Sequence, residues 1–286
     1  MNKVYTTSSA AEVLGVSEAT IKRWADAGLL KCVRTPGGHR KFDAPDVLGF
    51  LITPGPEVTA APLEAHRLDA TQIEARDLML RGDAERLVSI ITVRRAADST
   101  VAQVLDDVIA PALNDIGDCW AAGTVTAAEE HLASNTVIDT LARVRPMTTR
   151  VLPAGERALS ACMADEHHDI GSRMVALVLG ELGYEASTLG ANVPVGALAL
   201  MVARTRPAIV ALSASPRASI DRLRGDLAIL ATAARAARTR LVVGGPGFMR
   251  LAQLPGEATC HARLTDLLHA HSKLPARPRR TDDPAS

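Results

Sequence analysis

The sequence has almost no aromatic residues, no net charge and no long apolar run. Phe, Trp and Tyr make up 2% of the 286 residues although 47% are hydrophobic, so alanine, leucine and valine must fill the interior. Such a composition favours helices. Basic and acidic residues number 32 each, which excludes a global field that attracts nucleic acid, and any basic surface must therefore be local.

The cysteine pattern and the hydropathy of the chain indicate the compartment in which the protein works. No two cysteines form a CxxC pair, so free thiols in a reducing compartment are expected rather than a disulfide framework. No apolar run approaches the roughly 18 residues that a membrane span needs. The stretch "MNKVYTTSSAAEVLGV" also lacks the apolar core of a secretion signal. We therefore expect a soluble, cytoplasmic protein without a membrane partner. The cysteines are Cys32, Cys119, Cys162 and Cys260.

Residues 1–53 differ from the rest of the chain. "TTSSAAEVLGVSEATIKRWADAGLL" predicts a helix, a tight turn and a second helix. Ser9 and Ser17 are expected to cap these helices, and Gly15 and Gly28 to end them. "LKCVRTPGGHRKF" then predicts two short extended runs around a Pro-Gly-Gly turn.

A local basic excess accompanies this pattern. Between positions 17 and 42, six Lys or Arg stand against two acids. The bland alternative is a small helical domain with a solvated basic face. However, "IKRWADAGLL" followed by "RTPGGHRKF" resembles the winged helix-turn-helix of MerR-family regulators. The resemblance implies that Glu18–Ala27 enters a major groove and that the wing, Arg34–Lys41, contacts the backbone and the adjacent minor groove.

The residues expected at the DNA are mostly basic, and basic side chains suit phosphate contacts. Lys22 and Arg23 could reach either phosphates or guanine edges, and the sequence leaves that choice open. Trp24 is expected in the core. The candidate DNA-binding residues are Thr20, Lys22, Arg23, Arg34, His39, Arg40 and Lys41.

A linker and a helical bundle are predicted next. Residues 54–69 are rich in proline and glycine, as linkers are. Residues 70–150 carry apolar residues at helical spacing in four segments, which predicts a four-helix bundle. Pro111 is expected to kink the third helix. Thr126 and Glu129 stand at capping-box distance at the start of the fourth.

From about residue 155 the periodicity changes. Short runs typical of strands, such as "ALSACMA" and "AIVALSAS", alternate with helical runs such as "VGALALMVART". This alternation predicts a doubly wound, parallel Rossmann-like sheet over residues 155–272. Residues 273–286 are expected to be a disordered tail.

The loop "CMADEHHDIGSRM" follows the first of these strands, where ligands bind in such sheets. A solvated loop with two ordinary histidines is the alternative. Glu166, His168 and Gly171 fit E/D-x-H-x-x-G, with 41 residues between Gly171 and Ser213 and 28 between Ser215 and Gly244. The pattern resembles the cobalamin-binding fingerprint D-x-H-x-x-G, S-x-L, G-G. Its members here are Glu166, His168, Gly171, Ser213, Ser215, Gly244 and Gly245.

The chemistry of this loop is coherent. A neutral imidazole suits cobalt, and a carboxylate two residues away can accept its other N–H. The resemblance implies that His168 replaces the cofactor's dimethylbenzimidazole on the metal, and that the displaced nucleotide tail runs beside the sheet. The register excludes His167, because Ile170 would then take the glycine position; His167 is expected to face solvent. Glu166 in place of Asp and Ser215 in place of Leu are departures from the family pattern.

The bundle carries a second pattern. Trp120 is followed by nine residues and then Glu130-His131. A core tryptophan and a solvated Glu-His pair would be the ordinary explanation. A bundle before a cobalamin domain is also found in methionine-synthase-like modules. In this setting W-x9-E-H resembles CarH-type photoreceptor regulators, in which these residues line the pocket of the adenosyl group. In that family a histidine of this region commonly captures the cobalt after photolysis. Ala121, the residue after Trp120, cannot do so, whereas the nearby His131 or Cys119 could.

Three functions follow from these patterns. The resemblance implies a non-enzymatic transcriptional regulator, expected to be a repressor, that binds adenosylcobalamin and an operator in double-stranded DNA. In the dark the regulator would form a tetramer, and photolysis of the Co–C bond would dissociate that tetramer. The second candidate senses cobalamin or another tetrapyrrole without light, as Ala121 suggests. The third is a corrinoid carrier subunit of a methyltransferase or mutase, against which the helix-turn-helix argues.

Overall fold

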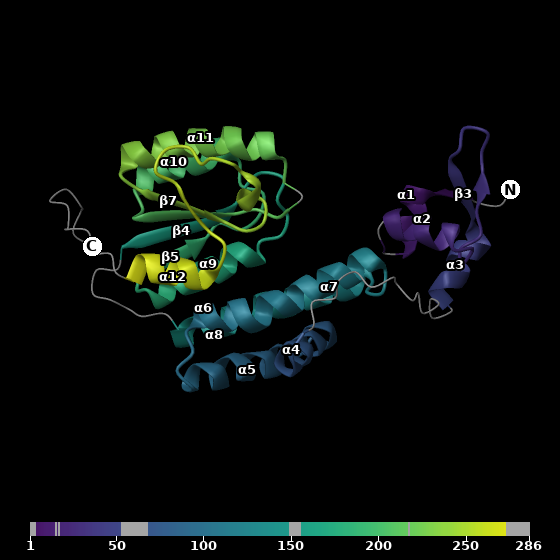
Figure 1. Cartoon of the computed structure of the whole chain (residues 1–286), viewed down its shortest axis with the longest axis horizontal. Coiled ribbons are helices and arrows are strands. Elements are labelled where there is room, and N and C mark those ends of the chain that lie inside the picture. The colour runs from purple at the N-terminus through teal and green to yellow at the C-terminus, as the bar shows by residue number, and fades with distance from the viewer. Residues whose placement is uncertain are drawn as a thin grey trace. The chain divides into compact units, whose positions relative to one another are not determined.

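The computed structural model describes residues 4–14, 16, 18–52, 68–148, 156–216 and 218–272. The chain forms two compact units, one of residues 1–87 and 108–136 and the other of residues 88–107 and 137–286. It carries an N-terminal winged helix-turn-helix, a helical bundle and a C-terminal parallel-sheet domain, as predicted (Figure 1). The predicted linker, except residues 68 and 69, and the predicted tail lie outside the described residues.

The helix-turn-helix domain is built on a small antiparallel sheet with strand order β1-β3-β2. The two strands of the predicted wing pair through Val33 with Lys41 and Arg34 with Arg40. Trp24 lies in the core beside Ile21 and Phe42, as predicted. Strand β1 and the last helix were not predicted. The elements are β1 (Val4–Thr6), α1 (Thr7–Leu14), α2 (Glu18–Asp26), β2 (Val33–Arg34), β3 (Arg40–Asp43) and α3 (Ala44–Ile52).

The cap of α1 differs from the prediction. Thr6 Oγ1 accepts from the Ser9 N–H at 3.1 Å, and Ser9 Oγ accepts from the Thr6 N–H at 2.8 Å. Thr6 is therefore the cap and Ser9 the third helical residue of a capping box, because the helix begins at Thr7, three residues earlier than a Ser9 cap predicts. Gly28, with φ +70°, follows the end of α2 as predicted. Gly15 and Ser17 lie outside the described residues.

The bundle contains the predicted helices, but the third predicted helix is divided into α-helical and π-helical parts. A single kinked helix was expected around Pro111, but a π-helical turn separates two α-helical parts there. Proline has no N–H for the carbonyl four residues back, so the regular ladder is broken at this point. The predicted Thr126–Glu129 capping box is confirmed, with bonds of 2.8 and 3.3 Å. The elements are α4 (Ala70–Arg81), α5 (Ala84–Ala96), α6 (Val101–Val104), the π-helix η1 (Leu105–Ile109), α7 (Ala110–Ala122) and α8 (Ala127–Thr148).

The C-terminal domain has a five-stranded sheet in which every neighbouring pair is parallel, in the order β5-β4-β6-β7-β8. The alternation of strands and helices was predicted; β8 and α12 were not. The elements are β4 (Arg157–Cys162), α9 (Ile170–Glu181), β5 (Glu185–Thr188), α10 (Val195–Thr205), β6 (Ile209–Ser213), α11 (Ile220–Ala237), β7 (Arg240–Gly244), the 3-10 helix η2 (Phe248–Arg250), β8 (Thr259–His261) and α12 (Leu264–Ser272).

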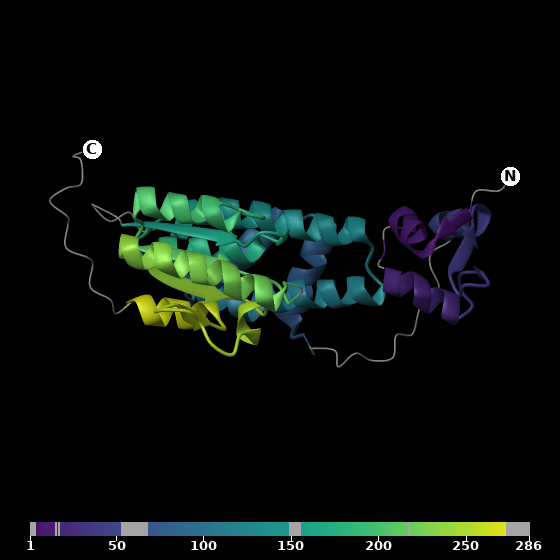
Figure 2. The ribbon, with the colours of Figure 1, turned by 90° about the horizontal axis from the view of Figure 1, so that it is seen from above.

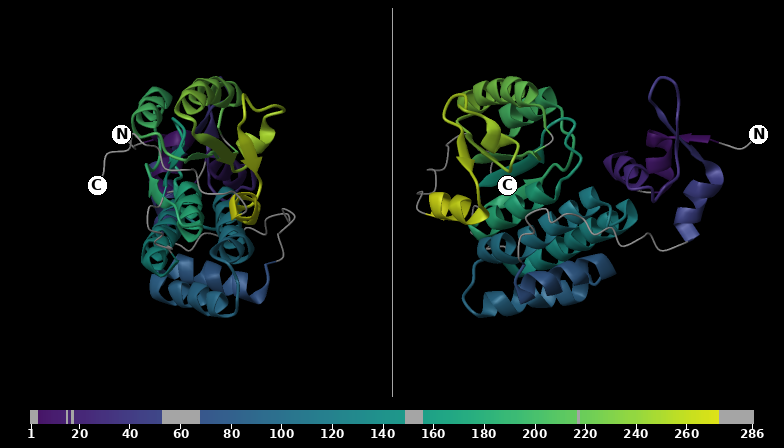
Figure 3. Two further views of the ribbon diagram at one scale, coloured as in Figure 1. Left: turned by 90° about the vertical axis from the view of Figure 1, so that its left-hand side faces the viewer. Right: turned by 45° about the vertical axis from the view of Figure 1, so that its right-hand side comes forward.

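Helices cover both faces of this sheet. Helices α10 and α11 lie side by side over one face, and α9 and α12 lie under the other (Figures 1, 2 and 3). Side chains alternate along each strand, so the two faces have different residues. Leu159, Val210, Leu212 and Val243 pack against α10 and α11 in the main core.

Two buried carboxylates join residues 88–107 to the sheet domain. Glu181, at the end of α9, accepts from the Val101 N–H at 3.1 Å and pairs with Arg95. Asp106, in the π-helix, accepts from the backbone N–H groups of Leu264 and Thr265 at 3.0 and 2.9 Å. Each carboxylate therefore caps a helix of the other segment, α6 in one case and α12 in the other.

The described helices include none that is both long and apolar enough to span a bilayer.

Asp106→Ala should destabilise the second unit by about 1–3 kcal/mol, because it leaves helix N–H groups without their acceptor. Asp107→Ala is the matched control, since it removes the same charge from an exposed side chain that pairs with Arg263 at 2.5 Å. An exposed pair contributes less than about 1 kcal/mol. Urea unfolding of the three proteins tests this expectation, and equal losses in the two variants would contradict it.

Candidate functional site

The predicted site residues of the C-terminal domain meet at the carboxyl edge of the sheet. The register aligns Cys162, the last residue of β4, with Ser213 of β6, and Ser213 with Gly244 of β7. The histidine loop leaves β4 directly after Cys162 and ends where α9 begins. Motifs that are distant in the sequence therefore lie at one edge, as the parallel topology requires.

Glu166 is the buried centre of this edge, with 5% of its side chain exposed. Its Oε1 lies 3.0 Å from both the backbone nitrogen and Nδ1 of His168. Its Oε2 accepts from the Ser215 N–H at 2.6 Å. Ser215, which departs from the family pattern in its side chain, thus contributes through its backbone.

The charge of Glu166 fixes the hydrogen-bonding state of His168. Burial alone would raise the pKa of Glu166, but the hydrogen bonds from His168 and Ser215 outweigh it and lower that pKa to about 2. An ionised carboxylate only accepts, so Nδ1 of His168 carries the hydrogen. In the neutral imidazole the lone pair then lies on Nε2, the atom that would coordinate a metal. The side chain of His168 is 64% exposed.

The glycines of the pattern stand where backbones and side chains approach closely. A Cβ at Gly171 would lie 2.6 Å from Ser213 Oγ. A Cβ at Gly245, whose φ is +87°, would lie 2.7 Å from the carbonyl oxygen of Ala214, and one at Gly244 would lie 3.0 Å from that of His261. Gly245 therefore requires glycine for both contact and conformation, while Gly171 and Gly244 are positions of close approach.

Sequence reasoning missed a residue that holds the loop. Asn192, in the loop after β5, accepts from the Asp165 N–H through Oδ1 at 2.9 Å and donates its own N–H to the Glu166 carbonyl at 2.8 Å. Its φ is +54°, a conformation that asparagine tolerates better than most residues. The signal was weak, because a lone asparagine in a loop has many ordinary roles.

A cavity of about 240 Å³ with charged and apolar lining residues lies beside the same loop. Asp165 pairs there with Arg222 of α11, a contact that the sequence did not indicate. Residues that line it are Met163, Asp165, Glu166, Ser215, Arg222 and Asp226. His167 is exposed, as expected from the register.

The predicted upper-face residues belong to the first unit. Trp120 is half-buried near the end of α7, and Ala121 beside it is exposed. On α8, Glu130 accepts from Ser134 Oγ at 2.8 Å and lies 3.6 Å from Nε2 of the exposed His131. Burial raises the pKa of the nearby Cys119 thiol.

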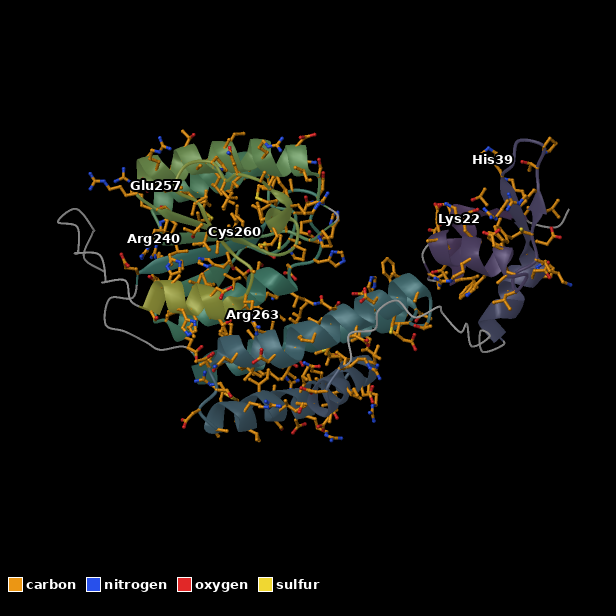
Figure 4. All side chains as sticks on the ribbon, viewed as in Figure 1. Lys22, His39, Arg240, Glu257, Cys260 and Arg263 are labelled. Atoms are coloured by element: carbon orange, nitrogen blue, oxygen red, sulfur yellow. The ribbon has the colours of Figure 1, made fainter. Side chains whose placement is uncertain are left out.

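The candidate DNA-binding residues differ in their accessibility. Lys22 and His39 are exposed, at α2 and near the tip of the wing (Figure 4). Arg34 is exposed too and lies 3.3 Å from Asp26. Arg40 is 16% exposed and pairs with the same carboxylate at 2.5 Å, so it braces the wing against α2.

The other three candidates are less accessible. Thr20 is fully buried. Arg23 and Lys41 are half-buried.

Comparisons with known families match each part of this architecture. Residues 4–51 match the helix-turn-helix domain family, and residues 74–145 and 156–259 match two B12 binding domain families. The HTH-type transcriptional repressor CarH of Myxococcus xanthus is 31% identical over 237 residues, which cover 74% of this chain and 79% of that protein. The chain belongs to the CarH family. It is therefore a cobalamin-binding transcriptional regulator, of the type that the sequence motifs resemble.

Two further relatives extend the comparison. The CarA repressor of the same organism is 27% identical over 219 residues, 71% of this chain and 74% of that protein. A solved structure, the monomethylamine corrinoid protein of Methanosarcina barkeri, has a TM-score of 0.54 at 15% identity and covers 70% of this chain and 96% of its own. The likeness to this solved structure shows that the chain shares the fold of a corrinoid protein. Both named relatives within the family are repressors, not enzymes.

Gly245→Ala should destabilise the protein by about 1–3 kcal/mol, since alanine at this φ is strained and meets the Ala214 carbonyl. Gly225→Ala on α11 is the matched control, because nothing lies within 4 Å of its added Cβ. In a helix that change is neutral or stabilises by up to about 1 kcal/mol. Thermal unfolding compares them, and equal stability would refute the steric account.

Proposed function

We propose that this protein is a light-responsive repressor that uses adenosylcobalamin to control its binding to double-stranded DNA. The observation that carries the proposal is the buried Glu166 carboxylate bonded to Nδ1 of the exposed His168 imidazole. The proposal assigns residues 1–53 to DNA binding, 54–69 to a linker, 70–150 to the cofactor's upper face, 155–272 to its lower face and 273–286 to a tail.

The residues of the lower face fit this cofactor. His168 would coordinate cobalt through Nε2, while Glu166 keeps the hydrogen on Nδ1 and makes the ligand more basic. The nucleotide tail would run beside the sheet along Ser213, Gly244 and Gly245, where the backbone can be approached closely because the two glycines have no side chain. When bound, adenosylcobalamin would supply a Co–C bond that light breaks.

The residues of the upper face supply shape and polarity in this proposal. Trp120 would pack on the adenosyl group, and Glu130 and His131 would line the same pocket. The half-buried position of Trp120 supports this assignment, since part of its side chain is accessible to a bound group.

Control of DNA binding would act through assembly. A loaded tetramer presents several winged helix-turn-helix domains, so its avidity exceeds the affinity of one domain, and loss of assembly releases the operator. The exposed Lys22, Arg34 and His39 would contact DNA directly. The brace between Arg40 and Asp26 supports a role for Arg40 in holding the wing in place.

A second candidate keeps cobalamin and DNA but not light. Ala121 is exposed immediately after Trp120 and offers cobalt no ligand, which favours a sensor of the intact cofactor. The two candidates differ in one result. Illumination of the loaded protein changes the gel-filtration volume in the first and leaves it unchanged in the second.

His168→Ala should remove the protein ligand of cobalt, whereas His167→Ala should not. The adjacent histidine is the matched control, because both side chains are exposed but only His168 is held by Glu166. Titration with adenosylcobalamin in the dark, followed by absorption spectra, should show the imidazole-ligated form for the wild type and for His167→Ala alone. An unchanged spectrum in His168→Ala would contradict the ligand assignment.

The same samples test regulation. In the dark, loading should increase the apparent mass in gel filtration and the affinity for an operator selected from random duplexes, in the wild type and not in His168→Ala. Green light should reverse both changes. If loading changes neither property in the wild type, the regulatory proposal fails.

A further inference from the structure

The sheet face toward α9 and α12 carries a strip of small side chains. Alternation along β4, β6 and β7 places Ser160, Ala211, Ser213, Val242 and Gly244 on this face, opposite the leucine-rich core. The hydroxyl of Ser160 donates to the carbonyl of Ser172 in α9 at 2.8 Å, which confirms the assignment of the face. A strip of small residues selects no ligand by itself.

Two histidines stand at the β8 side of this strip. His261 is the partner of Gly244 in the parallel ladder, so its side chain lies on the same face, next to the position without a side chain. His271, in the last turn of α12, is 8% exposed, and its ring meets that of His261 edge to face, with centroids 5.9 Å apart. The pair thus joins β8 to α12 beside the strip.

The histidine pair has hydrogen-bonding capacity that the protein does not use. Nε2 of His261 and Nδ1 of His271 are both buried, and neither has a hydrogen-bond partner among the described residues. Buried polar atoms in native proteins are nearly always paired, so these two nitrogens are suited to bond a group that enters from outside. Arg240, at the start of β7 (Figure 4), donates to Tyr184 Oη at 3.0 Å, while its own buried Nε also has no partner.

Both imidazoles are neutral near neutral pH. Burial lowers the pKa of His261. Burial, together with the charge of Arg240 and the neighbouring His261, lowers the pKa of His271 to about 4. A neutral imidazole can donate or accept one hydrogen bond at each nitrogen, and the positive charge of Arg240 opposes a bound cation here. The expected occupant is therefore an uncharged or anionic polar group.

We infer that His261 and His271 hydrogen-bond the displaced nucleotide tail of the cofactor and make the site selective for complete cobalamin over corrinoids without a tail. This inference rests on the proposed binding of cobalamin with His168 on the metal. The strip would accommodate the tail, and the histidine pair would recognise its polar atoms. Selectivity would arise because an unpaired buried donor or acceptor disfavours the ligand that leaves it unpaired.

The test compares cobalamin with cobinamide, which has the corrin ring and cobalt but no nucleotide tail. Spectral titration gives both dissociation constants for the wild type, His261→Phe, His271→Phe and the exposed control His269→Phe on the same helix. The affinity of each buried-site variant for cobalamin should fall about tenfold, the effect of one lost buried hydrogen bond. Affinity for cobinamide, and the His168-ligated spectrum with either corrinoid, should stay as in the wild type.

Two further arms identify the contact. His261→Gln keeps a nitrogen near the Nε2 position and should restore most of the preference for cobalamin. A cobamide with a phenolic base has the phosphate and ribose but no ring nitrogen in its base. If it binds the wild type like cobalamin, the histidines contact the phosphate or ribose; if it binds like cobinamide, they contact the base.

The outcomes separate this inference from the proposed function. Equal cobalamin-to-cobinamide preference in the wild type and the phenylalanine variants would overturn the inference and leave the function intact. Loss of both affinities in those variants would assign the pair a structural role and also overturn it. Failure of the wild type to bind either corrinoid would defeat the proposed function itself.

Discussion

A buried, ionised carboxylate governs the carboxyl edge of the sheet. The Glu166 side chain, which is 5% exposed, accepts two hydrogen bonds from His168 and one from Ser215, so it ties the loop after β4 to the end of β6. Burying a charge is costly unless hydrogen bonds replace water, and here they do so well enough to lower its pKa to about 2. Asn192 clamps the same loop from the β5 side. The imidazole tautomer follows from this arrangement, not from the histidine alone.

One face of the sheet packs the main hydrophobic core, and the other carries the residues to which binding is assigned. Large aliphatic side chains pack under α10 and α11, where they can be buried at native density. The other face has small residues, glycines in close contact and two histidines with unused nitrogens. The unpaired histidine nitrogens therefore lie on the face where binding of the cofactor tail is proposed. The capping carboxylates Asp106 and Glu181 hold the helices of this face against the bundle segment.

Local patterns in the sequence were sufficient for much of the fold and the centre of the site. The wing turn, the helix α10 and the glycine spacing were all predictable because their signals lie within a few residues or at fixed separations along parallel strands. The cap of α1 was misassigned, since both Thr6 and Ser9 suit a cap and only the start of the helix distinguishes them. Strand β8 has three residues, too few for a period to be recognised. Asn192 and Asp106 act through contacts distant in sequence, and the histidine pair meets only once β8 and α12 are packed together, so a single sequence does not reveal them.

The central claim is that Glu166 presents His168, through Nε2, to cobalt. Electron paramagnetic resonance of the protein loaded with cob(II)alamin tests it most directly, because the unpaired electron couples to the axial nitrogen. The account predicts a triplet splitting from that nitrogen in unlabelled protein, a doublet when the histidines carry nitrogen-15, and loss of the doublet in labelled His168→Ala. A triplet that persists in the labelled wild type would show that the cofactor's own base remains on the metal, and would contradict the account.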